Sequence, residues 1–171
     1  VFFTHVLSKY TKILTQSDID MKKLISIGAP TDRTFVMKNL KFDVKKSDEV
    51  IDMGQAGHRV IIAGSTHKGE DEIVLEMFKE KLAKYPDIKL LLVPRHTQRL
   101  PKIIDTINSM NLNYGLRSKG DTFKDHDVIL LDTMGELSKM YSICSFAFIG
   151  GSFNKTGGHN PLEATVYSKP T

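Results

Sequence analysis

Four short segments of the sequence combine small, polar and charged residues in ways that suit an anionic ligand. The first is Gly64-Ser65-Thr66-His67. A Gly-Ser-Thr turn at the start of a helix leaves backbone N–H groups free to bind a phosphate or a carboxylate. Serine and threonine are also ordinary helix caps, and capping is their more common use. The turn therefore predicts either an anion site or a helix cap.

The second segment is Pro94-Arg95-His96, with Arg99 three residues further on. Arginine binds a carboxylate or phosphate through two parallel hydrogen bonds, and a histidine can donate one more. Packing does not explain an Arg-His pair directly after an apolar strand. We expect Arg95 and His96 to contact a ligand, with chance placement on the surface as the alternative.

The third segment is Asp132-Thr133-Met134-Gly135-Glu136-Leu137. Gly135 lets a ligand approach the backbone closely, and the N–H groups of Gly135 and Glu136 would open a helix. The competing interpretation is a simple turn from strand to helix, in which Glu136 favours the helix dipole. The residues alone leave both interpretations open.

The fourth segment is Gly150-Gly151-Ser152, followed by Gly157-Gly158-His159-Asn160-Pro161-Leu162-Glu163. Four glycines within nine positions predict left-handed backbone or the close approach of a ligand. We expect Asn160 to cap a helix that begins at Pro161. The Glu163 carboxylate would then lie in the first turn, where it can accept hydrogen bonds from two sugar hydroxyls.

The elements between these segments predict an α/β domain with a doubly wound parallel sheet and helices on both faces. Short apolar runs typical of buried strands alternate with amphipathic, helix-forming stretches. Ligands of such sheets bind outside the carboxyl ends of the strands, where all four segments fall. The expected strands are 59–64, 88–93, 113–117, 128–131 and 146–149, and the expected helices are 70–85, 100–110, 136–142 and 161–167.

Residues 1–44 have a pattern of their own. They predict a strand at 12–16, a helix at 18–27 capped by Ser17 and closed by Gly28, and a strand at 34–37. We interpret 1–44 as the tail of a preceding domain with the crossover, and 45–55 as a polar linker. Residues 45–171 would then be a nucleotide-sugar-binding domain that is truncated at its end.

Composition restricts the class of protein only broadly. The chain has 171 residues, a net charge of +4 and a hydrophobic share of 40%, which fit a soluble globular domain. The basic charge fits a functional basic face, for an anionic ligand or an anionic membrane surface, and an ordinary solvated surface equally well. Cys144 is expected to be a small core residue, and no metal site is expected from the spacing of acidic residues. The P-loop, the G-x-G-x-x-G fingerprint and the G-x-S-x-G elbow are missing from the sequence.

Taken in order, the four segments closely resemble the 3-deoxy-D-manno-octulosonic acid (Kdo) transferases of lipopolysaccharide synthesis. The block from Gly157 to Glu163 is highly specific, and the resemblance spans nearly the whole chain. Residues 39–43 are similar to the family's crossover segment, with Lys38 where a glycine is expected. Ala164 stands where the family more often has proline, which leaves the expected helix cap intact.

The resemblance implies a two-domain GT-B glycosyltransferase that moves Kdo from CMP-Kdo to a lipid A precursor. The transfer would invert the anomeric carbon and need neither a metal nor another cofactor. Arg95 would face the CMP phosphate, and Asn160 and Glu163 would hold the ribose and phosphate region. The implied donor-binding residues are Gly64, Ser65, Thr66, Arg95, His96, Met134, Gly135, Glu136, Gly151, Ser152, His159, Asn160 and Glu163.

The same resemblance implies that the catalytic parts lie outside this chain. The family's general base, a glutamate, and its membrane-associating acceptor surface belong to the amino-terminal domain. We therefore expect the chain alone to bind the donor weakly and to transfer nothing. The implied location is the cytoplasmic face of the bacterial inner membrane, and nucleic acid is not an expected partner.

Two other functions fit the residues. One is a GT-B enzyme that uses a UDP-sugar, either a glycosyltransferase or a sugar-nucleotide epimerase of similar architecture. The other is a nucleotide-binding or regulatory module without catalytic activity. A preference for cytidine over uridine nucleotides would separate the Kdo transferase from the first of these.

Overall fold

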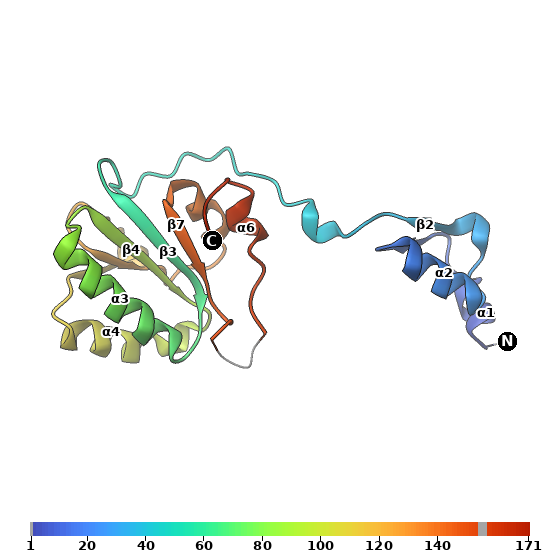
Figure 1. Cartoon of the computed structure of the whole chain (residues 1–171), viewed down its shortest axis with the longest axis horizontal. Helices are drawn as coiled ribbons and strands as arrows, with labels where there is room; N and C mark the ends of the chain where they lie inside the picture. The colour runs from blue at the N-terminus through green and yellow to red at the C-terminus, as the bar shows by residue number, and fades with distance from the viewer. Residues whose placement is uncertain (1, 154–156) are drawn as a thin grey trace. The chain divides into compact units, whose positions relative to one another are not determined.

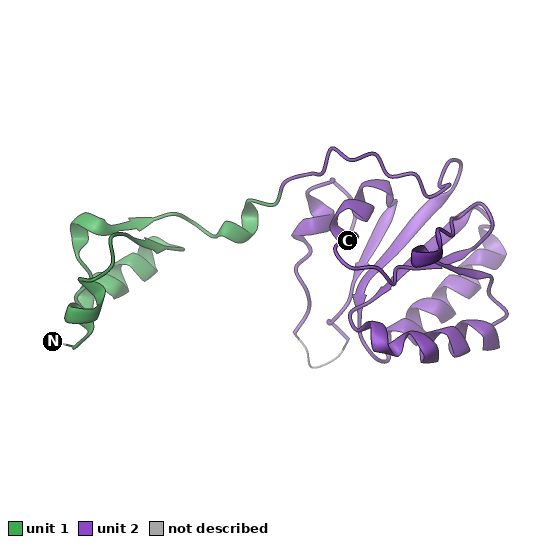
Figure 2. Cartoon of the chain, turned by 180° about the vertical axis from the view of Figure 1, so that it is seen from behind, with its two compact units in different colours: residues 1–44 green, residues 45–171 purple. Residues whose placement is uncertain are grey.

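The computed structural model describes residues 2–153 and 157–171 and divides into two compact units (Figure 2). Unit 1 is Val1–Val44 and unit 2 is Lys45–Thr171. The interpretation of unit 1 as the tail of an acceptor domain stays a prediction, as does the truncation of unit 2.

Unit 1 is a strand-helix-strand element preceded by a short helix. It comprises α1 (Phe2–Leu7), β1 (Ile13–Thr15), α2 (Asp18–Ser26) and β2 (Thr34–Val36), with β1 and β2 paired in parallel. The Ser17 hydroxyl accepts a hydrogen bond from the Asp20 N–H at 3.2 Å, which confirms the predicted cap of α2. Two 3₁₀ turns, Thr31–Arg33 and Leu40–Phe42, flank β2.

Unit 2 is built on a five-stranded sheet in which every pairing is parallel, as the alternation of strands and helices predicts. Its strands are β3 (Arg59–Thr66), β4 (Ile88–Pro94), β5 (Tyr114–Leu116), β6 (Val128–Leu130) and β7 (Phe146–Ile149). Their order across the sheet is β5-β6-β4-β3-β7. The chain crosses back between β6 and β7, so the β3 and β7 ends lie at a switch point where ligands bind in such sheets.

Helices cover both faces of this sheet. Figure 1 shows α3 (Glu70–Lys84) and α4 (Leu100–Ser109) along one face. That face buries alternate strand residues such as Ala63, Leu90 and Leu92 with Phe78 and Ile107 of the helices. The other face is covered by α5 (Leu137–Met140), the 3₁₀ turn Tyr141–Ile143 and α6 (Leu162–Thr165). Strand residues buried on both faces explain the continuous apolar runs of the sequence.

The segment 45–55, expected to be a linker, is partly core. Met53 is fully buried and Ile51 nearly so, both in the cluster under α5 and α6. The Met53 carbonyl accepts a hydrogen bond from the Phe123 N–H at 2.8 Å. The interpretation of the whole segment as a linker was therefore wrong. Val50 is 93% exposed, so the packed part of the segment begins one residue later, at Ile51.

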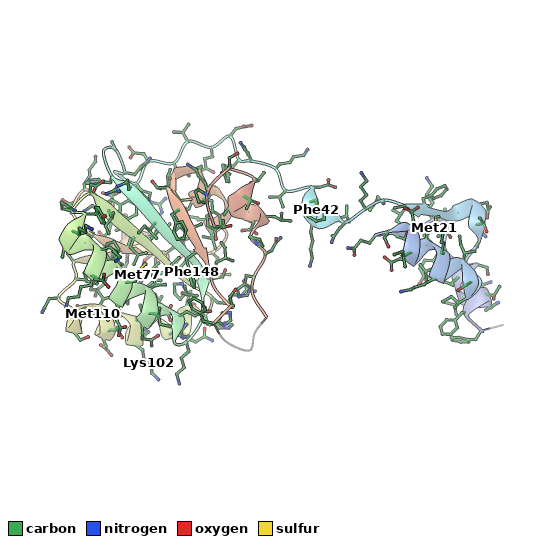
Figure 3. All side chains as sticks on the ribbon, viewed as in Figure 1. Met21, Phe42, Met77, Lys102, Met110 and Phe148 are labelled. Atoms are coloured by element: carbon green, nitrogen blue, oxygen red, sulfur yellow. The ribbon has the colours of Figure 1, made fainter. Side chains whose placement is uncertain are left out.

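The β7 edge of the sheet carries an apolar surface. Met77 of α3 and Phe148 of β7, both labelled in Figure 3, line an apolar pocket of about 260 Å³. The Ala147 N–H of β7 donates to the Pro170 carbonyl at 2.9 Å, so the last residues of the chain run along this strand.

The predicted core position of Cys144 is confirmed, because this residue is 1% exposed, and burial raises the pKa of its thiol to about 11.

Candidate functional site

The loops at the carboxyl ends of β3, β4 and β6 enclose a pocket of about 130 Å³. Four predicted donor-binding residues line it, namely Ser65, Arg95, Met134 and Gly135. Their side chains and backbone come from three of the four segments that the sequence singled out. The full lining is Ser65, Val93, Pro94, Arg95, Thr97, Leu131, Thr133, Met134, Gly135 and Leu137.

A bulge near the end of β3 presents Ser65 to the pocket. The β3–β4 register shifts between Gly64 and Thr66, and Ser65 has a φ of 56°. A non-glycine residue in this left-handed region is costly, and a bulge of this kind re-aims a side chain. Helix α3 begins only at Glu70 with Gly69 as its N-cap. The capping interpretation of Ser65 and Thr66 was therefore wrong.

Thr66 and Arg99 both bind the buried carboxylate of Asp71 and so stabilise the structure around the site. Thr66 is fully buried, and its hydroxyl donates to Asp71 Oδ1 at 2.5 Å. Arg99 forms an ion pair with the other oxygen of Asp71 and donates to the Thr66 carbonyl at 3.3 Å. Burial raises the pKa of Asp71, and the hydrogen bonds from Thr66 and Arg99 oppose the rise only in part. Of this set, Thr66 was predicted to bind the donor, but its hydroxyl is used internally.

Gly64 is a packing position. A β-carbon at this buried residue would collide with the hydroxyl of Tyr141, which lies in the 3₁₀ turn against the sheet. The glycine therefore lets Tyr141 pack over the end of β3. The structure gives Gly64 this packing role beneath the pocket, whereas the prediction had it in contact with the donor.

Arg95 and His96 are both exposed directly after β4. The Arg95 N–H donates to the Thr66 carbonyl at 2.9 Å, which fixes its backbone beside the turn after β3. Its guanidinium can thus reach an anion in the pocket. The two arginines of this segment have opposite surroundings, since Arg95 lines the pocket and Arg99 points inward to Asp71.

In the turn after β6, some residues line the pocket and Glu136 makes contacts within the structure. Met134 is 88% exposed and lines the pocket with Gly135. The Glu136 carboxylate instead accepts a hydrogen bond from the Thr133 hydroxyl and pairs with Arg117 at 3.3 Å. The Thr133 hydrogen bond lowers the pKa of Glu136, assisted by Arg117, while burial opposes it. Glu136 therefore shapes the turn, and its neighbours face the ligand space.

The fourth segment folds back onto the first as a glycine-rich loop, defined here as residues 150–153 and 157–160. Residues 154–156 of that segment lie outside the described residues. The Gly150 N–H donates to the Gly64 carbonyl at 2.8 Å, and the Gly158 N–H to the Gly151 carbonyl at 2.8 Å. Ser152 is exposed. The Asn160 side chain accepts from the Leu162 N–H at 3.1 Å, but α6 begins at Leu162 with Pro161 as its N-cap, so the prediction of Asn160 as the cap was wrong. Glu163 lies in the first turn of α6, as expected.

Three histidines meet where this loop approaches the turn after β3. The His67 and His159 rings are stacked, with their Nε2 atoms 2.7 Å apart, and His96 lies edge-on to His67 with 5.7 Å between ring centres. Burial lowers the pKa of His159, and the neighbouring His67 and Arg95 lower it further. The site thus joins His159 and His96, both predicted, with His67.

Sequence reasoning did not give Glu70 a role in the site. Its carboxylate is buried and accepts hydrogen bonds from the N–H groups of Gly151 at 2.8 Å, Phe153 at 3.1 Å and His67 at 2.9 Å. The sequence shows Glu70 only as the first residue of an amphipathic helix. An acidic residue directly after a small polar turn and before a distant glycine cluster is the one signal that could have pointed to it.

Neither a metal group nor a membrane span is found in the part of the chain that the structure describes. Within residues 2–153 and 157–171, no cluster of three or more His, Cys, Asp or Glu side chains is placed to hold a metal ion. Over the same residues, no helix combines the length and the apolar character needed to cross a bilayer.

Comparison with known proteins finds relatives that are similar to this chain over most of its length. Residues 1–44 match the family described as 3-deoxy-D-manno-octulosonic-acid transferase (kdotransferase). The 3-deoxy-D-manno-octulosonic acid transferase of Haemophilus influenzae is 37% identical over 171 residues. That alignment covers 95% of this chain and 40% of the relative, so the chain spans about two fifths of the length of this relative.

Two solved structures share the architecture. The C-terminal CMP-Kdo binding domain of WaaA from Acinetobacter baumannii matches with a TM-score of 0.65 and 33% identity, over 70% of this chain and 63% of that one. Anabaena Alr3699/HepE in complex with UDP-glucose matches with a TM-score of 0.51 and 16% identity, over 94% of this chain and 43% of that one. The second match concerns the fold alone, and with the first it places unit 2 among GT-B domains.

Proposed function

We propose that this chain, a homologue of the Kdo transferases, is the donor-binding part of an enzyme that transfers Kdo from CMP-Kdo to a lipid A precursor. The enzyme would thus act in lipopolysaccharide biosynthesis. The proposal concerns the whole enzyme, because the chain spans two fifths of the Haemophilus relative. In our proposal the fragment binds the donor nucleotide and does not itself transfer the sugar.

The observation that carries the proposal is the pocket at the carboxyl ends of β3, β4 and β6. It is lined by Ser65, Arg95 and Gly135, and it lies in a domain similar to the CMP-Kdo binding domain of WaaA from Acinetobacter baumannii. Pockets at this edge of a parallel sheet are the usual ligand sites of such folds. A small polar turn, an arginine and a glycine backbone together suit a nucleoside monophosphate.

The chemistry of donor cleavage gives these groups a purpose. When the bond between Kdo and CMP breaks, negative charge develops on the departing phosphate. Fixed donors aimed at that charge stabilise the transition state because they need no reorganisation during the reaction. We assign this role to Arg95 and to the backbone of the Gly135 turn. Inversion at the anomeric carbon without a metal is part of the proposal, since the departing charge is held by protein groups.

The first turn of α6 supplies the remaining contacts. The amide oxygen of Asn160 accepts from the Leu162 N–H at the start of α6, so its amide nitrogen is the part that can donate to the donor's phosphate region. The Glu163 carboxylate, half-buried one residue after the helix begins, can accept hydrogen bonds from two ribose hydroxyls. His159 and Ser152 would complete this wall of the site.

The remaining assignments rest on the family resemblance. We propose that a glutamate elsewhere in the whole enzyme is the general base, and that the acceptor is a lipid A precursor held at a membrane surface. The enzyme would then work at the cytoplasmic face of the bacterial inner membrane.

Calorimetric titration with CMP of the wild-type chain and of Glu163→Ala tests the proposal. The wild-type chain should bind CMP, and Glu163→Ala should bind about tenfold more weakly, since a hydrogen bond to a charged group contributes about 1.5–3 kcal/mol. Glu76→Ala, at an exposed position of α3, is the matched control and should bind like the wild type. A wild-type chain that gives no heat with millimolar CMP would contradict the proposal.

A further inference from the structure

We propose that Glu70 is a positioning residue, which holds the glycine-rich loop against the turn after β3 and so keeps the donor-binding wall in place. The inference rests on the proposed function, because it concerns the same site. Glu70 itself would not touch the donor, since its side chain is buried behind the loop and its oxygens are used by the backbone.

The geometry is that of a carboxylate enclosed by backbone donors. Both oxygens lie within 2.9 Å of the Gly151 nitrogen, and the first also accepts from Phe153 at 3.1 Å. The second oxygen accepts from the His67 N–H at 2.9 Å. Gly151 and Phe153 belong to the loop after β7, whereas His67 belongs to the turn after β3. One side chain therefore binds two segments, and Glu70 itself lies 81 positions from Gly151 in the sequence.

Charge makes this contact strong. A buried carboxylate is tolerated only when hydrogen bonds replace its water shell, and bonds to an ionised acceptor are about twice as strong as neutral ones. Burial alone would raise the pKa of Glu70, but the N–H groups of Gly151, His67 and Phe153 outweigh it and leave the pKa lowered. The carboxylate is therefore ionised in the neutral range and holds the loop there.

Backbone hydrogen bonds link Gly151 and its neighbour Gly150 to the residues that would bind the donor. Its carbonyl accepts from the Gly158 N–H at 2.8 Å, and the carbonyl of its neighbour Gly150 accepts from the His159 N–H at 3.2 Å. Asn160 follows immediately, and its side chain accepts from the Leu162 N–H at the start of the helix that carries Glu163. A shift of Gly151 would therefore displace the wall formed by residues 158–163.

Glu72, two residues further along α3, shows the ordinary use of an acidic residue in a first helical turn. Its carboxylate accepts from the N–H of Gly69, the N-cap of its own helix, at 2.9 Å. Glu72 thus contributes to helix capping without reaching the site. The pair offers a matched comparison, because Glu70→Gln and Glu72→Gln remove the same charge from the same turn.

The experiment combines hydrogen exchange of the intact chain with CMP titration for wild type, Glu70→Gln and Glu72→Gln. Glu70→Gln should lose protection at Gly151, Phe153 and Gly158 while β4 stays protected, and should bind CMP about tenfold more weakly, the equivalent of one lost charge-assisted hydrogen bond. Glu72→Gln should keep the protection of the loop and the affinity for CMP. Wild-type affinity or unchanged loop protection in Glu70→Gln would overturn the positioning role.

Failure of this inference and failure of the proposed function can be told apart, because hydrogen exchange needs no nucleotide. If the wild-type chain does not bind CMP but Glu70→Gln loses protection of the loop, the proposed function is contradicted and the link between Glu70 and the loop is supported. A chain that binds CMP equally well in all three forms would support the function and overturn the inference.

A titration of the wild-type chain covers the case in which Glu70→Gln does not fold. The amide signal of Gly151 should titrate with a midpoint below 4.5, the ordinary pKa of a glutamate, because its hydrogen bond weakens when the carboxyl gains a proton. The other titrating groups that face this contact are His67 on the turn after β3 and His159 on the glycine-rich loop. A Gly151 signal that follows only these histidines would overturn the assignment.

Discussion

The Nε2 atoms of His67 and His159 lie 2.7 Å apart, although the two residues are separated by 92 positions in the chain. Their rings are stacked with 5.0 Å between centres. A hydrogen bond between two imidazole nitrogens needs one proton and one lone pair, so at least one ring must be neutral. The contact joins the turn after β3 to the glycine-rich loop, alongside the Glu70 carboxylate.

This contact predicts an unusual titration of His159. Burial, His67 and Arg95 lower the pKa of His159 below its ordinary value of 6.5. The folded chain then binds this proton less tightly than the unfolded chain does. The contribution of His159 to stability is therefore complete above pH 6.5 and is lost as the pH falls through the lowered pKa.

NMR titration of the His159 ring protons checks this prediction. The midpoint should lie below 6.5 in the wild type and should rise toward 6.5 in His67→Ala, which removes a neighbouring positive charge. A His159 midpoint at or above 6.5 in the wild type would contradict the lowered pKa.

The two arginines after β4 should respond to substitution in opposite ways. Arg99→Ala leaves the buried carboxylate of Asp71 without its ion-pair partner and should lower the free energy of unfolding by about 3–5 kcal/mol. Arg95→Ala removes an exposed side chain and should change it by less than about 0.5 kcal/mol. In the whole enzyme, Arg95→Ala should instead raise the barrier to transfer by roughly 3–4 kcal/mol.

Urea denaturation of the chain and turnover of the whole enzyme separate these two roles. Equal loss of stability in both variants would contradict the inward placement of Arg99. Normal turnover of the Arg95→Ala enzyme would show that Arg95 does not face the departing phosphate.

The packing of Gly64 beneath Tyr141 predicts that even an alanine is too large there. Gly64→Ala should lower the free energy of unfolding by about 1–3 kcal/mol, because the new methyl group meets the Tyr141 hydroxyl. Removing that hydroxyl in the double variant Gly64→Ala, Tyr141→Phe should restore part of the loss. A double-mutant cycle by urea denaturation measures the coupling, and strictly additive effects would mean that the two groups do not touch.

The sheet could be predicted from the sequence because its strands are buried on both faces. Runs such as 59–64 and 88–93 are apolar throughout, which few other elements require. The order of the strands could not be predicted, since β6 lies between β4 and β5 through contacts that no local pattern encodes. The burial of Met53 was missed for the same reason, because its partner Phe123 is distant and a single methionine in a polar run shows no periodicity.

The candidate site, too, could be predicted from the sequence only in part. The residues at strand ends were identified because parallel strands bring their carboxyl ends to one edge. Their individual uses could not be read from residue types. Thr66 and Arg99 look like ligand-binding groups in the sequence, but Asp71 binds both of them. Glu70 looks like an ordinary helix residue, although its partners lie in the loop after β7.

The packed part of segment 45–55 gives a further prediction. Met53→Ala should lower the free energy of unfolding by about 2–5 kcal/mol, because it leaves a cavity in the core under α5 and α6. Val50→Ala removes an apolar side chain only three residues earlier, at an exposed position, and should change stability by less than about 0.5 kcal/mol. Thermal or urea denaturation compares the two variants. Similar small effects would place Met53 in a solvated linker.

The central claim is that the pocket between Ser65, Arg95 and Gly135 belongs to a cytidine-nucleotide donor site. Parallel calorimetric titrations of the wild-type chain with CMP and with UDP test it most directly. The claim predicts that CMP binds more tightly than UDP, and that Arg95→Ala weakens CMP binding without unfolding the chain. Tighter binding of UDP would favour an enzyme that uses a UDP-sugar, and it would contradict the claim.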